Sequence, residues 1–217
     1  MSPGKRTVHH ADALAWLGAQ GPIAGASMVT SLPDFSEFPN LSLTEWKEWF
    51  VRAVTLVLSR TPDDGVAIFF QTDAKKDGAW VDKAYLCQKA AEATGHELLW
   101  HKLVLRAPPG NVLFGRPAYS HMLCFAKTIR ADLGKSTTDV LPHPGEKTWA
   151  RAMGLKACLA AGRFILAHTK SHTIVDPFCG HGTMLAVANE LGLDAVGVEL
   201  SRRRAEKAMV LKMSCHE

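Results

Sequence analysis

Apolar and polar residues follow two alternating patterns along the chain. Short apolar runs occupy residues 26–34, 65–72, 172–176 and 194–200, and such runs are typical of strands in a parallel sheet. Between them lie segments whose apolar residues recur at helical intervals, the clearest beginning at Ser42 with Glu45 at the capping-box spacing. Strands that alternate with helices predict an α/β fold with a doubly wound, mostly parallel sheet.

The middle of the chain departs from this alternation. Extended runs at residues 98–106 and 119–127 flank a stretch rich in proline and glycine, which predicts an antiparallel hairpin with a long loop. Helices are expected over about 80–94 and 148–168. The sequence contains no internal repeat, low-complexity segment or domain-sized linker, so one domain over residues 1–217 is expected.

Composition excludes several classes of protein. The hydrophobic content of 47% suffices for a core, but no apolar run approaches the roughly twenty residues of a membrane span. The five cysteines show no CxxC spacing, which argues against a disulfide framework or a metal site and for a reducing compartment. With no apolar run typical of a secretory signal near the N-terminus, an intracellular, cytoplasmic location is expected, with the nucleus left open. A net charge of +4 is compatible with nucleic acid and equally with many small enzymes.

The stretch "VDPFCGHGT" carries candidate chemistry. Asp176 ends a strand and is followed by a loop in which Gly180 and Gly182 allow the backbone to approach a ligand closely. The loop lacks both the GK[ST] of a phosphate-binding loop and the third glycine of a dinucleotide fingerprint, which favours a nucleoside with an amino-acid tail. Glu199 ends the next strand, where a carboxylate can accept hydrogen bonds from both ribose hydroxyls. The alternative is an ordinary strand-to-helix turn with a capping Asp.

The chain resembles the class I S-adenosylmethionine-dependent methyltransferases. "TIVDPFCGHGTMLAVANELGLDAVGVELS" is similar to their first two motifs, and "HHADAL" to their third. "HPGEK" is similar to the segment before the glycine loop in DNA and RNA amino-methyltransferases whose motifs run in circularly permuted order. The resemblance implies a Rossmann-like, doubly wound and mostly parallel sheet with a C-terminal antiparallel hairpin and a circularly permuted motif order, with the remaining strands upstream of the glycine loop.

The resemblance also implies a cofactor, S-adenosylmethionine, and the residues that bind it. The single methyltransferase domain would consist of a substrate and catalytic half, residues 1–128, and a cofactor-binding half, residues 140–217. For Asp12, His143 and Lys147 the alternative is a capping or solvated residue near a helix start. The implied cofactor-binding residues are Asp12, His143, Lys147, Asp176, Phe178, Gly180, Gly182, Thr183 and Glu199.

"SLPD", residues 31–34, lies where the family carries its catalytic tetrapeptide of Asp, Asn or Ser, two prolines and an aromatic residue. Ser31 and Pro33 match this pattern, whereas a leucine replaces the first proline and Asp34 replaces the aromatic residue. Ser31 and a backbone carbonyl would accept hydrogen bonds from the target amine, Asp34 could remove a proton, and Phe35 or Phe38 could supply the stacking surface. The predicted catalytic residues are Ser31, Pro33 and Asp34. In the alternative, "SLPD" ends a strand and Asp34 caps a turn.

The substrate is predicted from what the chain lacks. About fifteen residues separate Lys127 from His143, where sequence-specific DNA methyltransferases carry a sizeable target-recognition region. This favours RNA, with tRNA as the first candidate, and a protein partner could supply recognition. A small-molecule, protein or DNA methyltransferase is the alternative, and a cofactor-binding, non-catalytic subunit is a third.

The proline-rich loop is the candidate substrate edge. Basic residues cluster around it, and aromatic residues nearby could stack on bases or pack in the core. The basic residues are Lys75, Lys76, Lys102, Arg106 and Arg116, and the aromatic ones are Trp80, Trp100 and Phe114.

Overall fold

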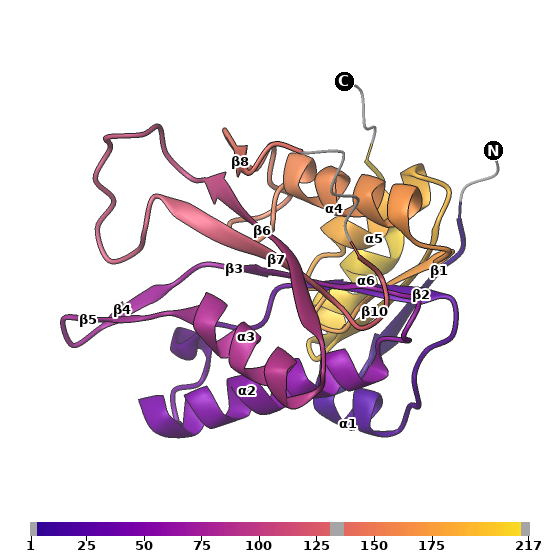
Figure 1. The fold of residues 1–217 in the computed structure, drawn as a ribbon, viewed down its shortest axis with the longest axis horizontal. Coiled ribbons are helices and arrows are strands. Elements are labelled where there is room, and N and C mark those ends of the chain that lie inside the picture. The colour runs from indigo at the N-terminus through magenta and orange to yellow at the C-terminus, as the bar shows by residue number, and fades with distance from the viewer. Residues whose placement is uncertain (1–3, 131–136, 214–217) are drawn as a thin grey trace.

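An eight-stranded sheet forms the middle layer of the molecule (Figure 1). The computed structural model describes residues 4–130 and 137–213. The strands lie in the order β1-β10-β9-β2-β3-β7-β6-β8, in which β1, β10, β9, β2 and β3 run parallel to one another. Their bounds are β1 (Arg6–His10), β2 (Ala26–Thr30), β3 (Ala67–Gln71), β6 (Glu97–Leu105), β7 (Tyr119–Ala126), β8 (Val140–Leu141), β9 (Thr173–Asp176) and β10 (Asp194–Glu199).

The predicted α/β fold with a mostly parallel sheet is confirmed. The predicted hairpin is also present: β6 and β7 pair antiparallel, and β7 pairs antiparallel with β3. This hairpin lies in the middle of the chain, whereas strands near the two ends of the chain, β1 and β10, are neighbours in the sheet. That the motifs are circularly permuted relative to other methyltransferases stays a prediction.

Helices cover both faces of the sheet. One face is covered by α1 (Ala13–Gly18), α2 (Leu43–Arg60) and α3 (Lys83–Ala93). The other face is covered by α4 (Leu155–His168), α5 (Thr183–Glu190) and α6 (Arg202–Val210). Successive residues of β3 point to opposite faces: Phe69 packs with α2 and α3, and Ile68 and Phe70 pack with α4 and α5. Because both faces are buried, β3 is a nearly continuous apolar run.

The helix starts follow local capping chemistry. α2 begins with the predicted capping box, in which the Ser42 hydroxyl accepts from the Glu45 N–H and the Glu45 side chain accepts from the Ser42 N–H. The prediction that α3 begins near residue 80 was wrong, because Asp82 caps the helix. Residues before it form an unpredicted antiparallel hairpin of β4 (Ala74–Lys76) and β5 (Ala79–Val81). The expected start of α4 at residue 148 was also wrong, because Gly154 with φ +99° precedes the helix.

The described residues bear on the expectations about membrane spans and cysteines. Within the ranges 4–130 and 137–213, no helix is both long and apolar enough to cross a membrane. The cysteines of these ranges are all buried, while Cys215 lies outside them; the buried ones are Cys87, Cys124, Cys158 and Cys179.

Gly182 fixes the approach of α5 to α6. It precedes α5 with φ +82°, and a Cβ at this position would lie 2.8 Å from the Cα of Ala208 on α6. A side chain here would meet backbone, which cannot rotate away. Gly182 is therefore required for the packing of α5 against α6. It does not line the cavity described below.

Substitution of Gly182 by alanine should destabilise the protein more than the same change at Gly78. Gly78 has φ +83°, but a Cβ there meets nothing within 4 Å, so Gly78→Ala reports backbone strain alone. We expect the free energy of unfolding to fall by about 1 kcal/mol for Gly78→Ala and by about 3 kcal/mol for Gly182→Ala, measured by urea denaturation. Equal losses would show that α6 does not constrain this position.

Candidate functional site

A cavity of about 490 Å³ opens where the parallel strands end. Its lining includes a residue at or just after the carboxyl end of each of five strands: Asp12 follows β1, Ser31 follows β2, Thr72 follows β3, and Asp176 and Glu199 end β9 and β10. Ligand sites in open α/β sheets form at this edge, because loops from neighbouring parallel strands meet there. The cavity thus brings the segment "SLPD" and the glycine loop to one place.

Most of the predicted site residues line this cavity. Two do not: Gly182, for the reason given above, and His143. His143 is exposed, and its Nε2 lies 3.4 Å from the Nζ of Lys156. The predicted residues in the lining are Asp12, Ser31, Pro33, Asp34, Lys147, Asp176, Phe178, Gly180, Thr183 and Glu199.

Asp176 is a buried carboxyl in the lining of the cavity. It is 2% exposed, and its Oδ1 accepts hydrogen bonds from the Thr30 hydroxyl at 2.7 Å and the Phe178 N–H at 3.2 Å. Burial raises its pKa to about 7, with a smaller contribution from the negative charge of Glu199, although the two hydrogen bonds act in the opposite direction. Without a ligand, Asp176 is therefore partly protonated near neutral pH.

Glu199 is oriented by the turn after β10. It is 8% exposed, and its Oε1 accepts the N–H of Ser201 at 2.7 Å and pairs with the Nε of Arg204 at 3.1 Å. Both contacts use Oε1, so the lone pairs of Oε2 remain available to a ligand.

Trp149 was missed in the sequence analysis. Its ring stacks on His181, with centroids 4.6 Å apart, and a Cβ on Gly180 would lie 2.8 Å from the ring. Gly180, at φ +56°, therefore allows the indole to lie against the loop. The neighbouring Thr148 hydroxyl lies 2.6 Å from that of Thr183. The sequence does offer a signal for Trp149, because it is an aromatic residue two positions after the candidate Lys147. The sequence analysis instead assigned Trp149 to the predicted helix 148–168.

The segment "SLPD" combines both alternatives considered for it. Asp34 does cap a turn: its carboxylate accepts the N–H of Ser36 at the start of a short 3₁₀ helix, η1 (Phe35–Glu37). It also lines the cavity, as does Ser31 from the same segment. Of the two candidate stacking residues, Phe38 lines the cavity, while Phe35 packs against Trp46.

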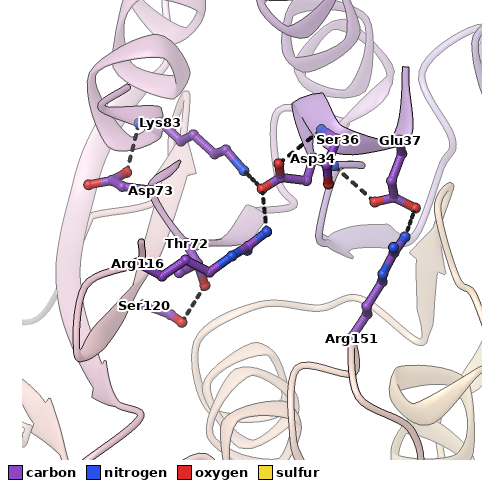
Figure 2. A network of polar contacts seen from close by, with 9 residues as sticks. All are labelled: Asp34, Ser36, Glu37, Thr72, Asp73, Lys83, Arg116, Ser120 and Arg151. Carbon is purple, nitrogen blue, oxygen red and sulfur yellow. Dashed lines mark hydrogen bonds and ion pairs between the residues drawn. The ribbon is translucent and has the colours of Figure 1, made fainter. Parts of the chain in front are cut away.

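Two cations from distant elements hold Asp34. Its Oδ2 pairs with Lys83 Nζ at 2.8 Å and with an Arg116 guanidinium nitrogen at 3.3 Å (Figure 2). Burial alone would raise the pKa of Asp34, but Lys83, the Ser36 N–H and Arg116 together lower it below its usual range. Asp34 is therefore ionised at neutral pH and is a weak proton acceptor.

Lys83 is itself fixed by a second carboxylate. Its side chain is 3% exposed, and its backbone N–H donates to Asp73, which also lies 2.9 Å from Nε2 of His121. Burial lowers the pKa of Lys83. Because a buried charge without a partner is costly, the pair with Asp34 constrains both side chains.

An ion pair joins segments from the two predicted halves of the chain. Glu37, on the 3₁₀ helix, pairs with Arg151, in the segment before α4 (Figure 2). Both residues line the cavity, so the segment after β2 and the segment before α4 contact each other at it.

The raised pKa of Asp176 predicts a dependence of stability on pH. The folded-state pKa, about 7, lies above the ordinary value of 3.8, so folding retains a proton that the unfolded chain releases. The free energy of unfolding should therefore fall as pH rises from about 4 to 7. Asp176→Asn removes this term and should gain, relative to wild type, on the order of 2 kcal/mol between pH 5 and pH 8 in urea denaturation. A difference that does not change with pH would contradict the assignment.

The C-terminal part of the chain matches a known family. Residues 159–210 match a family described as DNA methylase, and this segment contains the glycine loop, α5 and β10. A comparison with curated protein sequences finds no match.

Solved structures share the fold over nearly the whole chain. A putative DNA modification methylase from Thermus thermophilus superposes with a TM-score of 0.71 at 17% identity, covering 94% of this chain and 92% of that one. The same protein complexed with S-adenosyl-L-methionine gives 0.70 at 19% identity, covering 94% and 91%. The cytosine-N4-specific PvuII DNA methyltransferase gives 0.69 at 16% identity, covering 97% and 88%.

The chain therefore has the fold of class I methyltransferases, and the predicted resemblance to the amino-methyltransferases is confirmed at the level of the fold.

Proposed function

We propose that the protein is an S-adenosylmethionine-dependent methyltransferase that methylates an exocyclic amino group of a nucleobase in DNA. The observation that carries the proposal is that Asp176, Glu199 and Ser31 line the same cavity, at the ends of neighbouring strands. The match of residues 159–210 to the DNA methylase family supports it. So do the solved structures, one of which holds S-adenosyl-L-methionine.

The cofactor side of the cavity fits this cofactor. Oε2 of Glu199 is free to accept hydrogen bonds from ribose hydroxyls, and Asp176 is a buried carboxyl that a cationic amino group would stabilise in its ionised form. Gly180 leaves room for Trp149 beside the loop. When bound, S-adenosylmethionine supplies an electrophilic methyl group on a positively charged sulfur.

Further residues would complete the cofactor site. Four of the predicted residues line the same cavity and could contact the cofactor directly: Asp12, Lys147, Phe178 and Thr183. Asp12 also caps α1 through Oδ1, which leaves its second oxygen available. His143 and Gly182 would act only indirectly, since they lie outside the lining.

On the substrate side, positioning supplies the rate. Ser31 Oγ would accept a hydrogen bond from the target amine, and Pro33 would fix the backbone so that a carbonyl accepts the second N–H. Asp34 is too weakly basic to serve as an efficient general base, because Lys83 and Arg116 keep its pKa low. We assign it a positioning role instead: its carboxylate is held by Lys83 and Arg116 and caps η1, and it thereby fixes the segment that carries Ser31.

DNA is preferred to RNA as the polymer. In the sequence alone, the short connection between Lys127 and His143 argues against a sequence-specific DNA methyltransferase. The argument is weaker now, because the superposition covers 88% of the PvuII DNA methyltransferase, so this chain lacks little of that protein's length. The preference for DNA rests on the descriptions of the matching family and structures. RNA, tRNA in particular, and a protein partner that supplies recognition are the alternatives for the test below.

Methyl transfer from labelled S-adenosylmethionine tests the proposal. Duplex DNA, single-stranded DNA and tRNA are offered in parallel to wild type, Ser31→Ala and Ser59→Ala, a serine on α2 outside the cavity. We expect label in DNA as N4-methylcytosine or N6-methyladenine. Ser31→Ala should lower kcat about 100-fold through misplacement of the amine, and Ser59→Ala should not.

Two results would contradict the proposal. Label in tRNA alone would replace DNA by RNA as the polymer. Cofactor binding without transfer to any acceptor would favour a non-catalytic subunit or a missing partner.

A further inference from the structure

Two segments, the β4–β5 hairpin and the loop between β6 and β7, project from the same side of the molecule (Figure 1). The first is the β4–β5 hairpin, residues 74–81, which leaves the cavity lining at Thr72 and returns to it at Lys83. The second is the β6–β7 loop, residues 107–115, which is flanked in the same way by Arg106 and Arg116. All four flanking residues line the cavity, so the two projections share its rim.

The bases of the projections are joined. The hydroxyl of Thr72, before the hairpin, lies 2.6 Å from that of Ser120, after the loop (Figure 2). Lys83, after the hairpin, and Arg116, after the loop, both bind Asp34. The bases of the hairpin and of the loop therefore both lie beside Asp34.

Each projection exposes a large aromatic side chain. Trp80 on the hairpin is 53% exposed, and Phe114 in the loop is fully exposed. Trp100, the third candidate for stacking on bases, instead packs edge-to-face on Phe164, with centroids 5.2 Å apart. The structure thus separates the candidates: Trp100 packs against the core, whereas Trp80 and Phe114 are exposed on the hairpin and on the loop.

Two lysines of the hairpin lie near aromatic rings. Lys75 Nζ lies 5.9 Å from the centre of the Trp80 ring. Lys76 Nζ lies 5.8 Å from the centre of the Phe35 ring and 3.5 Å from Asp77, in an exposed ion pair that a phosphate can replace. Lys102 does not contribute, because it is buried and donates to Thr137 and Thr138. Exposed aromatic rings interleaved with cations are the pattern that binds nucleic acid with unpaired bases, through stacking and phosphate contacts.

We infer that the β4–β5 hairpin and the β6–β7 loop form a two-sided entrance that binds an unpaired stretch of the DNA substrate. Trp80 and Phe114 stack on the bases next to the target base, and Lys75 and Lys76 contact phosphates. A base taken out of its stack leaves neighbours that have lost a stacking partner, and the two rings replace that partner. The inference rests on the proposed function, because it takes the molecule that enters the cavity to be a nucleic acid.

The test measures strand binding separately from catalysis. Fluorescence anisotropy with labelled single-stranded DNA, in the presence of S-adenosylhomocysteine, compares variants that keep a ring with variants that remove it. Phe114→Leu and Trp80→Leu should each raise Kd about tenfold, whereas Phe114→Tyr and Trp80→Phe should stay within about twofold of wild type. Both residues are exposed, so thermal unfolding should not change.

Two further measurements complete the design. Val112→Ala removes an apolar side chain, 93% exposed, from the same loop and should leave Kd unchanged, because it has no ring. Lys75→Ala with Lys76→Ala should lower the slope of log Kd against log salt by about 1.4, the value for two single-strand phosphate contacts.

The outcomes separate this inference from the proposed function. If wild type methylates DNA but the leucine variants bind the strand as tightly as wild type does, the entrance is wrong and the proposed function stands. Equal weakening by Val112→Ala would point to a general apolar contact and would also overturn the stacking. If wild type neither binds nor methylates any polynucleotide, the proposed function fails as well.

Discussion

A buried hydrogen bond between Thr30 and Asp176 sets the geometry of the site. The Thr30 hydroxyl donates to Oδ1 of Asp176 at 2.7 Å, from the end of β2 to the end of β9. These strands pair in parallel at the centre of the sheet, with Met28 opposite Val175. Ser31 directly follows the donor and the glycine loop follows the acceptor, so this one contact fixes the proposed catalytic segment relative to the proposed cofactor-binding loop. A buried carboxyl left without such donors would carry a large desolvation cost.

Two aspartates of the same cavity have opposite electrostatic environments. Asp34 is surrounded by Lys83 and Arg116, which lower its pKa, whereas burial raises the pKa of Asp176 to about 7. Different environments give chemically identical groups different roles. Asp34 carries a fixed negative charge that is already paired. Asp176 is a site where a cationic ligand group gains most, because binding that group also removes the cost of ionising a buried carboxyl.

Much of the fold could be predicted from local patterns, because the central strands are continuous apolar runs and the helices follow a 3.6-residue period. The glycine loop and "SLPD" were also visible, since short motifs lie within one segment. Lys83 was not predictable as a partner of Asp34, because 49 residues separate them and only the packing of α3 brings them together. The same limit applies to Arg116, which reaches Asp34 from the far end of a long loop.

Two boundary errors had functional consequences. The helix predicted from about residue 80 began inside β5 and included Trp80, which is exposed on the hairpin. The helix predicted from residue 148 likewise included Trp149, which precedes α4. In both places a turn that requires positive φ, at Asp77–Gly78 and at Gly154, outweighs helical spacing of apolar residues. At Gly154 a tertiary contact also matters, because a Cβ there would lie 2.4 Å from the carbonyl oxygen of Pro144. At Gly78 a Cβ would meet nothing within 4 Å, so that turn is set by local backbone conformation.

The central claim is that one cavity holds S-adenosylmethionine against Glu199 and Asp176 with its reactive end toward Ser31. The most direct measurement is the crystal structure of the protein with S-adenosylmethionine bound. The account predicts ligand density in this cavity, with the ribose hydroxyls on Oε2 of Glu199, the amino-acid tail beside Asp176 and the methyl group facing Ser31. Density elsewhere, or a cavity that stays without ligand in crystals grown with excess cofactor, would contradict it.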